Sequence, residues 1–186
     1  MNIYFWINCF FTFSLLGYIL ECLVLTFENR QIVYNRGFGH GPFCIIYGFG
    51  AVGAALLLGP FADNMVKLYF GSLLMATTME LVTARIMIWI FGTFWWDYSH
   101  KKYNYKGIIC LESSLGWGVL GIVFFRILNV RVQGMVSHIP SNMEKYVALS
   151  LIIFYAVDFL YSFRTEFKVR DQEKEVPVIG RMKINR

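Results

Sequence analysis

The sequence predicts an all-α integral membrane protein: a bundle of about five transmembrane helices, with the N-terminus outside and the C-terminus in the cytoplasm. The first observation is composition, because 57% of the residues are hydrophobic and only 16% are charged, whereas soluble domains carry about 25% charged residues. The second is a series of apolar stretches, since a spanning helix needs about 17–25 such residues. The third is an uneven distribution of Lys and Arg, which sets orientation.

The expected helices are taken in chain order. They cover residues 3–27, 42–58, 68–91, 108–128 and 146–163. The first ten residues contain no Lys or Arg and no small-residue cleavage site follows the first stretch, so we expect a retained helix and not a cleaved signal peptide. Residues 1–165 are therefore the expected transmembrane domain, and residues 166–186 are the expected basic cytoplasmic tail.

Basic residues gather on one side of this arrangement. That side holds Arg30, Arg36, Lys101, Lys102, Lys106 and seven more Lys and Arg residues between positions 164 and 186. The opposite side holds Lys67, Arg131, Lys145 and, near a helix end, Arg126. By the positive-inside rule the richer side is cytoplasmic. The basic tail favours contact with anionic lipid headgroups of the bilayer, and we expect no nucleic-acid partner because no aromatic platform accompanies it.

Ionisable residues interrupt the apolar stretches. They are Glu21, Glu80, Arg85, Glu112 and Asp158. A charge inside a spanning helix costs roughly 2.5–3.5 kcal/mol even on the lenient insertion scale, so these residues mark a candidate ligand-binding site. A rise of about 1.5 Å per residue places all five within roughly 15 Å of the cytoplasmic face. This predicts an acidic, cytoplasm-facing pocket, and the alternative is a set of structural hydrogen bonds near the interface.

The charges in this group do not balance. Four carboxylates against one guanidinium leave an excess of negative charge, which protonation, a bound cation or water must relieve. Glu80 and Arg85 are five residues apart, about 140° around a helix, which is not the three- or four-residue spacing of an intrahelical pair. We therefore expect Arg85 to pair with a carboxylate on another helix. The sequence leaves open whether the carboxylates bind a metal ion.

The segment RGFGHGP at residues 36–42 leads into the second expected helix. Pro42 suits the first helical turn, and Gly37 and Gly41 permit tight backbone turns. Exposed amides at a helix N-terminus beside Arg36 and His40 could hold a phosphate or carboxylate. The alternative is a structural re-entrant turn, because the segment lacks the Lys and Ser or Thr of a phosphate-binding P-loop.

The third loop, TFWWDYSHKKYNYKG, combines paired tryptophans with polar residues. Tryptophans at a helix end are typical of the aromatic belt at the membrane interface. Asp97 could cap a turn, complete the acidic pocket together with Tyr98 and Ser99, or bind a lipid headgroup. The glycines of the second and fourth stretches, including Gly48 and Gly118, suit close contact between helices. Four scattered cysteines without a CxxC pair argue against a zinc or redox centre.

Several motifs together carry a family resemblance. They are GYxxE ending at Glu21, RGFxxGPFxxIYGxGA at residues 36–51, Glu80, WDYS ending at Ser99, and GxIxLExS beginning at Gly107, followed by Trp117 and Gly118. This set resembles the bacterial family described as putative ABC-transporter type IV, or CmpB-like. The resemblance implies a bacterial multi-pass membrane protein with a permease role, and Tyr47 of its second motif joins the candidate ligand-binding residues.

Three function classes remain open. The leading hypothesis is a transporter permease component whose acidic pocket binds a cation, a proton or a cationic solute. The alternatives are a non-catalytic membrane scaffold or regulator, and a membrane-embedded enzyme acting on a phosphorylated lipid or nucleotide. No ATPase motif GxxxxGK[ST] and no catalytic constellation is present, and no cofactor is expected. Five helices are few for a conduction path, so we expect a homodimer, a separate ATPase or another membrane subunit.

Overall fold

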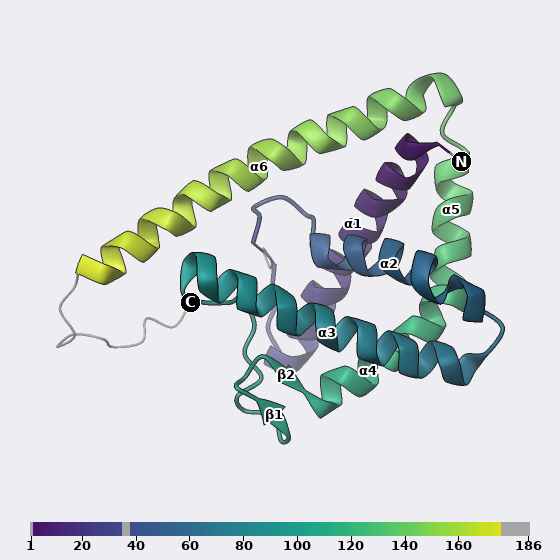
Figure 1. The fold of residues 1–186 in the computed structure, drawn as a ribbon. Coiled ribbons are helices and arrows are strands. Elements are labelled where there is room, and N and C mark those ends of the chain that lie inside the picture. Colours follow the sequence, from purple (N-terminus) through teal and green to yellow (C-terminus); the bar gives the residue numbers. More distant parts are fainter. Residues whose placement is uncertain (1, 35–37, 176–186) are drawn as a thin grey trace.

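The computed structural model describes residues 2–34 and 38–175 of the chain, which are mostly helical (Figure 1). The long helices are α1 (Ile3–Asn29), α2 (Ile45–Leu58), α3 (Met65–Phe91), α4 (Leu111–Val123), α5 (Asn129–Ser137) and α6 (Ser141–Glu175). A 3-10 turn, Gly59–Phe61, follows α2, and a π-helical segment, Phe124–Leu128, joins α4 to α5. Two short strands, β1 (Asn104–Tyr105) and β2 (Ile109–Cys110), pair antiparallel between α3 and α4.

Four helices in the described part of the chain are long and apolar enough to cross a membrane. They are Ile3–Asn29, Met65–Phe91, Leu111–Ser137 and Ser141–Lys168, and a shorter apolar helix covers Ile45–Phe61. The prediction of an all-α, multi-pass membrane protein is thereby confirmed. Four long apolar helices and one shorter apolar helix stand where about five spanning helices were expected. The side of the membrane on which each terminus lies stays a prediction.

Local sequence sets the helix ends. The side chain of Asn2 accepts a hydrogen bond from the Phe5 amide at 2.9 Å, and Asn64 accepts one from the Lys67 amide at 3.0 Å. Each asparagine thus satisfies an amide that the first turn of a helix leaves without a partner. Gly92 ends α3 in the left-handed conformation with φ of 81°, which a residue without Cβ adopts at little cost.

The second helix departs from expectation. It begins at Ile45, so Pro42 lies before the helix and not in its first turn. The Cys44 amide donates to the Ser14 carbonyl at 3.0 Å, which places the start of α2 beside the middle of α1. The chain between residues 38 and 44 is non-helical backbone, which meets α1 at its end and contacts α6 at His40. Such backbone is tolerated at membrane depth only where protein buries it or a water-filled cavity adjoins it.

The last two helices are longer than expected. The helix expected at residues 108–128 begins at Leu111 and continues through the π-helical segment and α5 to Ser137. The wider π turn bends the chain, so α4 lies along α3 whereas α5 lies along α1 (Figure 1). Helix α6 continues to Glu175, which makes the first part of the expected polar tail helical.

Small residues bring the helices close together. A Cβ at Gly121 of α4 would overlap the Cβ of Ser72 on α3, and a Cβ at Gly118 would lie 2.5 Å from the Tyr69 ring. A Cβ at Gly48 of α2 would lie 2.8 Å from the backbone carbonyl of Phe10. Such contacts let helix backbones approach where lipid gives no hydrophobic drive for association. The main core lies between α1, α2 and α5. It includes Phe5, Cys9, Phe13, Ala51, Ala54, Phe124, Val132 and Val136.

Two glycines of α4 provide a matched test of this packing. Gly121→Ala should destabilise the protein by about 1–3 kcal/mol, because the Ser72 Cβ is fixed to its backbone and cannot rotate away. A Cβ at Gly116 would meet open space, with no atom within 4 Å, so Gly116→Ala should be neutral or stabilise by up to about 1 kcal/mol. Thermal unfolding in detergent measures both. Equal unfolding temperatures would contradict the close α3–α4 contact.

Candidate functional site

A buried carboxylate lies where α3 meets the third loop. Glu80 is only 5% exposed. The Tyr98 hydroxyl donates to its Oε1 at 3.0 Å, and the Ser113 hydroxyl lies 3.3 Å from its Oε2. The indole nitrogen of Trp117 is buried beside this carboxylate, but no described group stands in hydrogen-bonding geometry to it. Three segments, α3, the third loop and α4, thus converge on one acidic side chain.

A second carboxylate faces the same place from α1. The Tyr47 hydroxyl donates to Glu21 Oε1 at 2.5 Å. The Tyr47 ring packs directly against α1 at Gly17, where a Cβ would overlap the ring. Gly17 therefore permits the approach that brings the phenol to Glu21, one helical turn further along α1.

Aromatic contact joins the two halves. The rings of Tyr47 and Trp117 meet edge to face, with centroids 5.7 Å apart, and Glu21 is close enough to interact electrostatically with Glu80 and Tyr98. We call the six residues of this arrangement the acidic site. They are Glu21, Tyr47, Glu80, Tyr98, Ser113 and Trp117. The two carboxylates are held by neutral groups, and in the described part of the chain neither forms an ion pair.

The third loop positions Tyr98 through a tight turn. Asp97 accepts hydrogen bonds from the Ser99 amide at 2.8 Å and from the Ser99 hydroxyl at 3.0 Å. Gly107 lies against this carboxylate with φ of 70°, where a Cβ would sit 2.8 Å from Asp97 Oδ1. Of the three hypotheses for Asp97, these contacts favour the turn cap. The WDYS motif therefore places Asp97 and Ser99 in the turn and Tyr98 in the site.

Two further hydrogen bonds hold the loop backbone that carries Tyr98. The Trp96 indole donates to the Ile108 carbonyl at 2.7 Å, and the Tyr98 amide donates to the Gly107 carbonyl at 2.9 Å. Burial raises the pKa of Tyr98 well above its ordinary value, and the neighbouring Glu80 carboxylate raises it further. The phenol consequently stays protonated at neutral pH and remains a hydrogen-bond donor.

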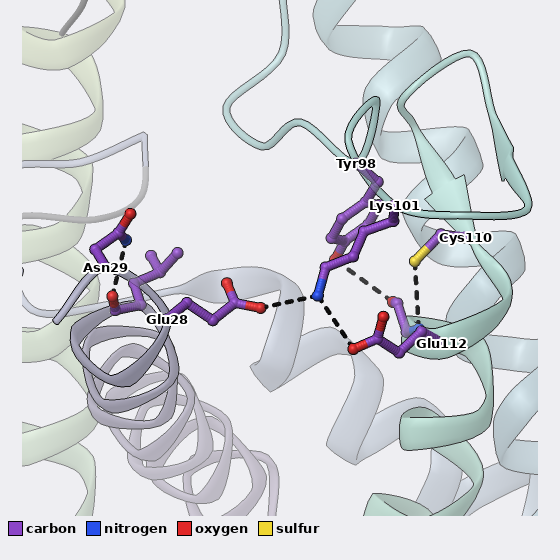
Figure 2. A network of polar contacts seen from close by, with 8 residues as sticks. Glu28, Asn29, Tyr98, Lys101, Cys110 and Glu112 are labelled. Carbon is purple, nitrogen blue, oxygen red and sulfur yellow. Dashed lines mark hydrogen bonds and ion pairs between the residues drawn. The ribbon is translucent and has the colours of Figure 1, made fainter.

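Glu112 lies apart from the acidic site and has a basic partner. Lys101 Nζ is 3.1 Å from Glu112 Oε1 and 3.1 Å from Glu28 Oε1, so one ammonium bridges the start of α4 and the end of α1 (Figure 2). Hydrogen bonds to Glu112 and Glu28 raise the pKa of Lys101. Neither Lys101 nor Glu28 was predicted as a site residue. Lys101 was expected on the cytoplasmic side, and Glu28 directly follows the first expected helix on that side, which is a signal that could have paired them.

Asp158 holds the segment that precedes α2. The His40 amide donates to Asp158 Oδ1 at 3.0 Å, and His40 Nδ1 lies 2.8 Å from the Ser162 hydroxyl. Gly39 and Gly41 lie against the same carboxylate, leaving no room for a Cβ at Gly39. An amide expected to hold a bound anion is thus occupied by a carboxylate of the chain itself. The expected contributions of Arg36 and Gly37 lie outside the described residues.

The expected pairing of Arg85 is wrong for the part of the chain that the structure describes. Arg85 is exposed and makes no ion pair there. The helical geometry explains the outcome, because five residues turn Arg85 about 140° away from the buried Glu80. A long arginine side chain can bury its stem and carry its charge toward the interface. The expected single cluster therefore divides into three places: the acidic site, the Lys101 bridge and the Asp158 contact.

Metal binding finds no support in the described residues. No group of three or more His, Cys, Asp or Glu side chains there could hold a metal ion. Three residues that shape the acidic site, Gly17, Ser113 and Trp117, were predicted only as parts of motifs and not as ligand candidates. Their positions in GYxxE and in or after LExS are the signal that could have identified them.

The chain is similar to a family of known proteins. A family model described as putative ABC-transporter type IV matches residues 8–163. The chain belongs to this family. The match includes all six residues of the acidic site, and with four long apolar helices it shows a multi-pass membrane protein related to membrane transporters. Neither a curated protein nor a solved structure matches the chain.

The Tyr98 hydrogen bond can be tested directly. Tyr98→Phe should destabilise the protein by about 1–3 kcal/mol, because a buried carboxylate loses a donor. Tyr105→Phe is the matched control, since this tyrosine lies in the same loop, is 47% exposed and should change stability little. Thermal unfolding in detergent at neutral pH compares them. A Tyr98→Phe protein as stable as the control would argue against a charged Glu80 held by Tyr98.

Proposed function

We propose that this protein is a transporter permease component whose acidic site binds a proton or a cationic solute. The observation that carries the proposal is Glu80, a carboxylate 5% exposed within a candidate spanning helix, with Glu21 close enough to repel it. Neutral donors satisfy its hydrogen bonds without removing its charge. A proton or a cation would neutralise the site, as burial in low dielectric demands.

The aromatic side chains of the acidic site favour a cationic solute over a bare metal ion. The aromatic side chains Tyr47, Tyr98 and Trp117 line the two carboxylates, and the face of such a ring attracts an ammonium or guanidinium group. A divalent metal ion such as Ca²⁺ needs more oxygen ligands than two carboxylates supply. Reversible neutralisation is also what a transport site requires, because the ligand must leave after it has entered.

Charge asymmetry supports a site that faces the cytoplasm. The end of α1 beside the acidic site carries Arg30, and the third loop carries Lys101, Lys102 and Lys106. By the positive-inside rule this end is the cytoplasmic one. Because the chain lacks a P-loop motif, energy from ATP would have to come from a separate subunit, and a second copy of the chain could complete the conduction path.

The enzyme alternative is less favoured by the contacts. Its phosphate-binding feature depended on free amides in residues 36–42, and the His40 amide already donates to Asp158. The scaffold alternative requires no ligand at the acidic site. It becomes the preferred function if no ligand stabilises the protein.

A thermal-shift screen in detergent tests the proposal. We expect polyamines, cationic vitamins or other ammonium-bearing solutes, or a fall in pH, to stabilise the wild type, whereas phosphorylated lipids and nucleotides should not. A ligand at a hundred times its dissociation constant adds about 2.7 kcal/mol to the stability of a folded state that alone binds it. Metal salts are included as a separate arm.

Matched variants locate the effect. Glu21→Gln and Glu80→Gln keep the shape of each side chain and should abolish the stabilisation by cations. Asp63→Asn removes an exposed carboxylate between α2 and α3 and should leave it intact. If no ligand shifts the wild type while both Gln variants unfold more readily, the carboxylates are structural and the transport proposal fails.

Orientation has its own test. In a variant without the four native cysteines, His100→Cys should be protected from an impermeant thiol reagent in intact cells, whereas Ser141→Cys should react. His100 lies in the third loop and Ser141 begins α6, and both are exposed. Reaction at position 100 combined with protection at position 141 would reverse the topology and place the acidic site outside.

A further inference from the structure

Lys101 makes both ion pairs found among the described residues. Its side chain is 21% exposed, whereas those of Glu28 and Glu112 are 46% and 70% exposed. The ammonium thus lies between two carboxylates that water and ions can reach. Figure 2 shows it extending from the loop into the space between the end of α1 and the start of α4.

The loop that carries Lys101 also carries Tyr98 of the acidic site. The Lys101 amide donates to the Tyr98 carbonyl at 2.9 Å, and the Asn104 side chain donates to the Lys101 carbonyl at 2.8 Å. These hydrogen bonds join the two residues in one turn. A movement that pulls Lys101 away from α1 would therefore also draw Tyr98 away from Glu80.

We propose that Lys101 is a latch that closes the acidic site by binding the third loop to Glu28 of α1, and that an incoming cation opens it by competing for Glu28 and Glu112. The inference rests on the proposed function, since it describes access to the same site. The latch would regulate access to the site, which the ligand screen does not measure.

Charge and exposure explain why a cation would compete. One ammonium faces two carboxylates, so the bridge keeps a net negative charge, and Glu112 is additionally favoured at the N-terminus of α4 by the helix dipole. Exposed pairs of this kind are weak and respond to salt. A latch of this strength would hold the loop closed at rest and release it to a competing cation.

The test measures how fast a thiol inside the site reacts. Ser113→Cys is introduced into a variant without the four native cysteines, and its reaction with the neutral reagent N-ethylmaleimide is followed in detergent. A neutral reagent separates opening of the loop from attraction to charge. Lys101→Met should raise the rate roughly three- to tenfold, the range expected for losing two weak ion pairs, and Glu28→Gln should act in the same direction.

Lys102→Met is the matched control, because Lys102 is the next residue, is exposed and makes no ion pair in the described part of the chain. It should leave the rate unchanged. Raising the salt from about 0.01 M to about 1 M shortens the Debye length from about 30 Å to about 3 Å. This should speed the reaction of the protein that keeps Lys101 and have little effect on the Lys101→Met protein.

Each outcome decides the latch. The latch would be overturned if the reaction rate were the same in Lys101→Met, in Lys102→Met and in the protein that keeps both lysines. A salt effect that persists in Lys101→Met would also overturn it. Spermidine at constant ionic strength should speed the reaction only when Lys101 is present, and an unchanged rate would reject opening by a competing cation. If Lys101→Met folds poorly, the Glu28→Gln protein gives the same test. Failure of the ligand screen would leave these rates unaffected, so the two proposals fail separately.

Discussion

The burial of the Glu80 carboxylate is the constraint on which the rest of the site depends. A charged group removed from water must gain hydrogen bonds, because leaving it unsatisfied costs several kcal/mol. The backbone groups of helix α3 are already paired within the helix. The donors come from Tyr98 of the third loop and Ser113 of α4. The tight turn at Asp97 and the close α3–α4 contact at Gly121 are what bring those donors within reach.

The second half of the site depends on a helix that begins inside the protein. Because α2 starts beside the middle of α1, Tyr47 meets Glu21 from the side, and Gly17 leaves the space for its ring. The non-helical segment before α2 is held by Asp158 and by aromatic contacts of Phe38 with α3 and α6. These contacts hold the described part of the glycine-rich segment, residues 38–42, between α3 and α6.

In the proposed function, the separation of charges would give a cation a graded approach to the acidic site. Glu28 and Glu112 are exposed and share the Lys101 ammonium, whereas Glu80 is buried and held by neutral donors. A cation would thus meet weak, screened charges first and a strongly desolvated one afterwards. The proposed latch and the proposed binding site are consecutive positions along this approach.

The sequence by itself determined the all-α membrane architecture, because long apolar stretches can satisfy their backbone in lipid only as helices. It also identified Glu21, Glu80 and Tyr98 as candidate ligand-binding residues. The two carboxylates interrupt apolar stretches, and Tyr98 belongs to the WDYS motif. Only the tertiary structure decided which charges meet. Arg85, expected as the partner of a carboxylate, is exposed, whereas Lys101 from a loop makes the ion pairs found in the described part of the chain. Spacing along the chain gives the face of a helix, but the packing of helices and loops determines what lies opposite that face.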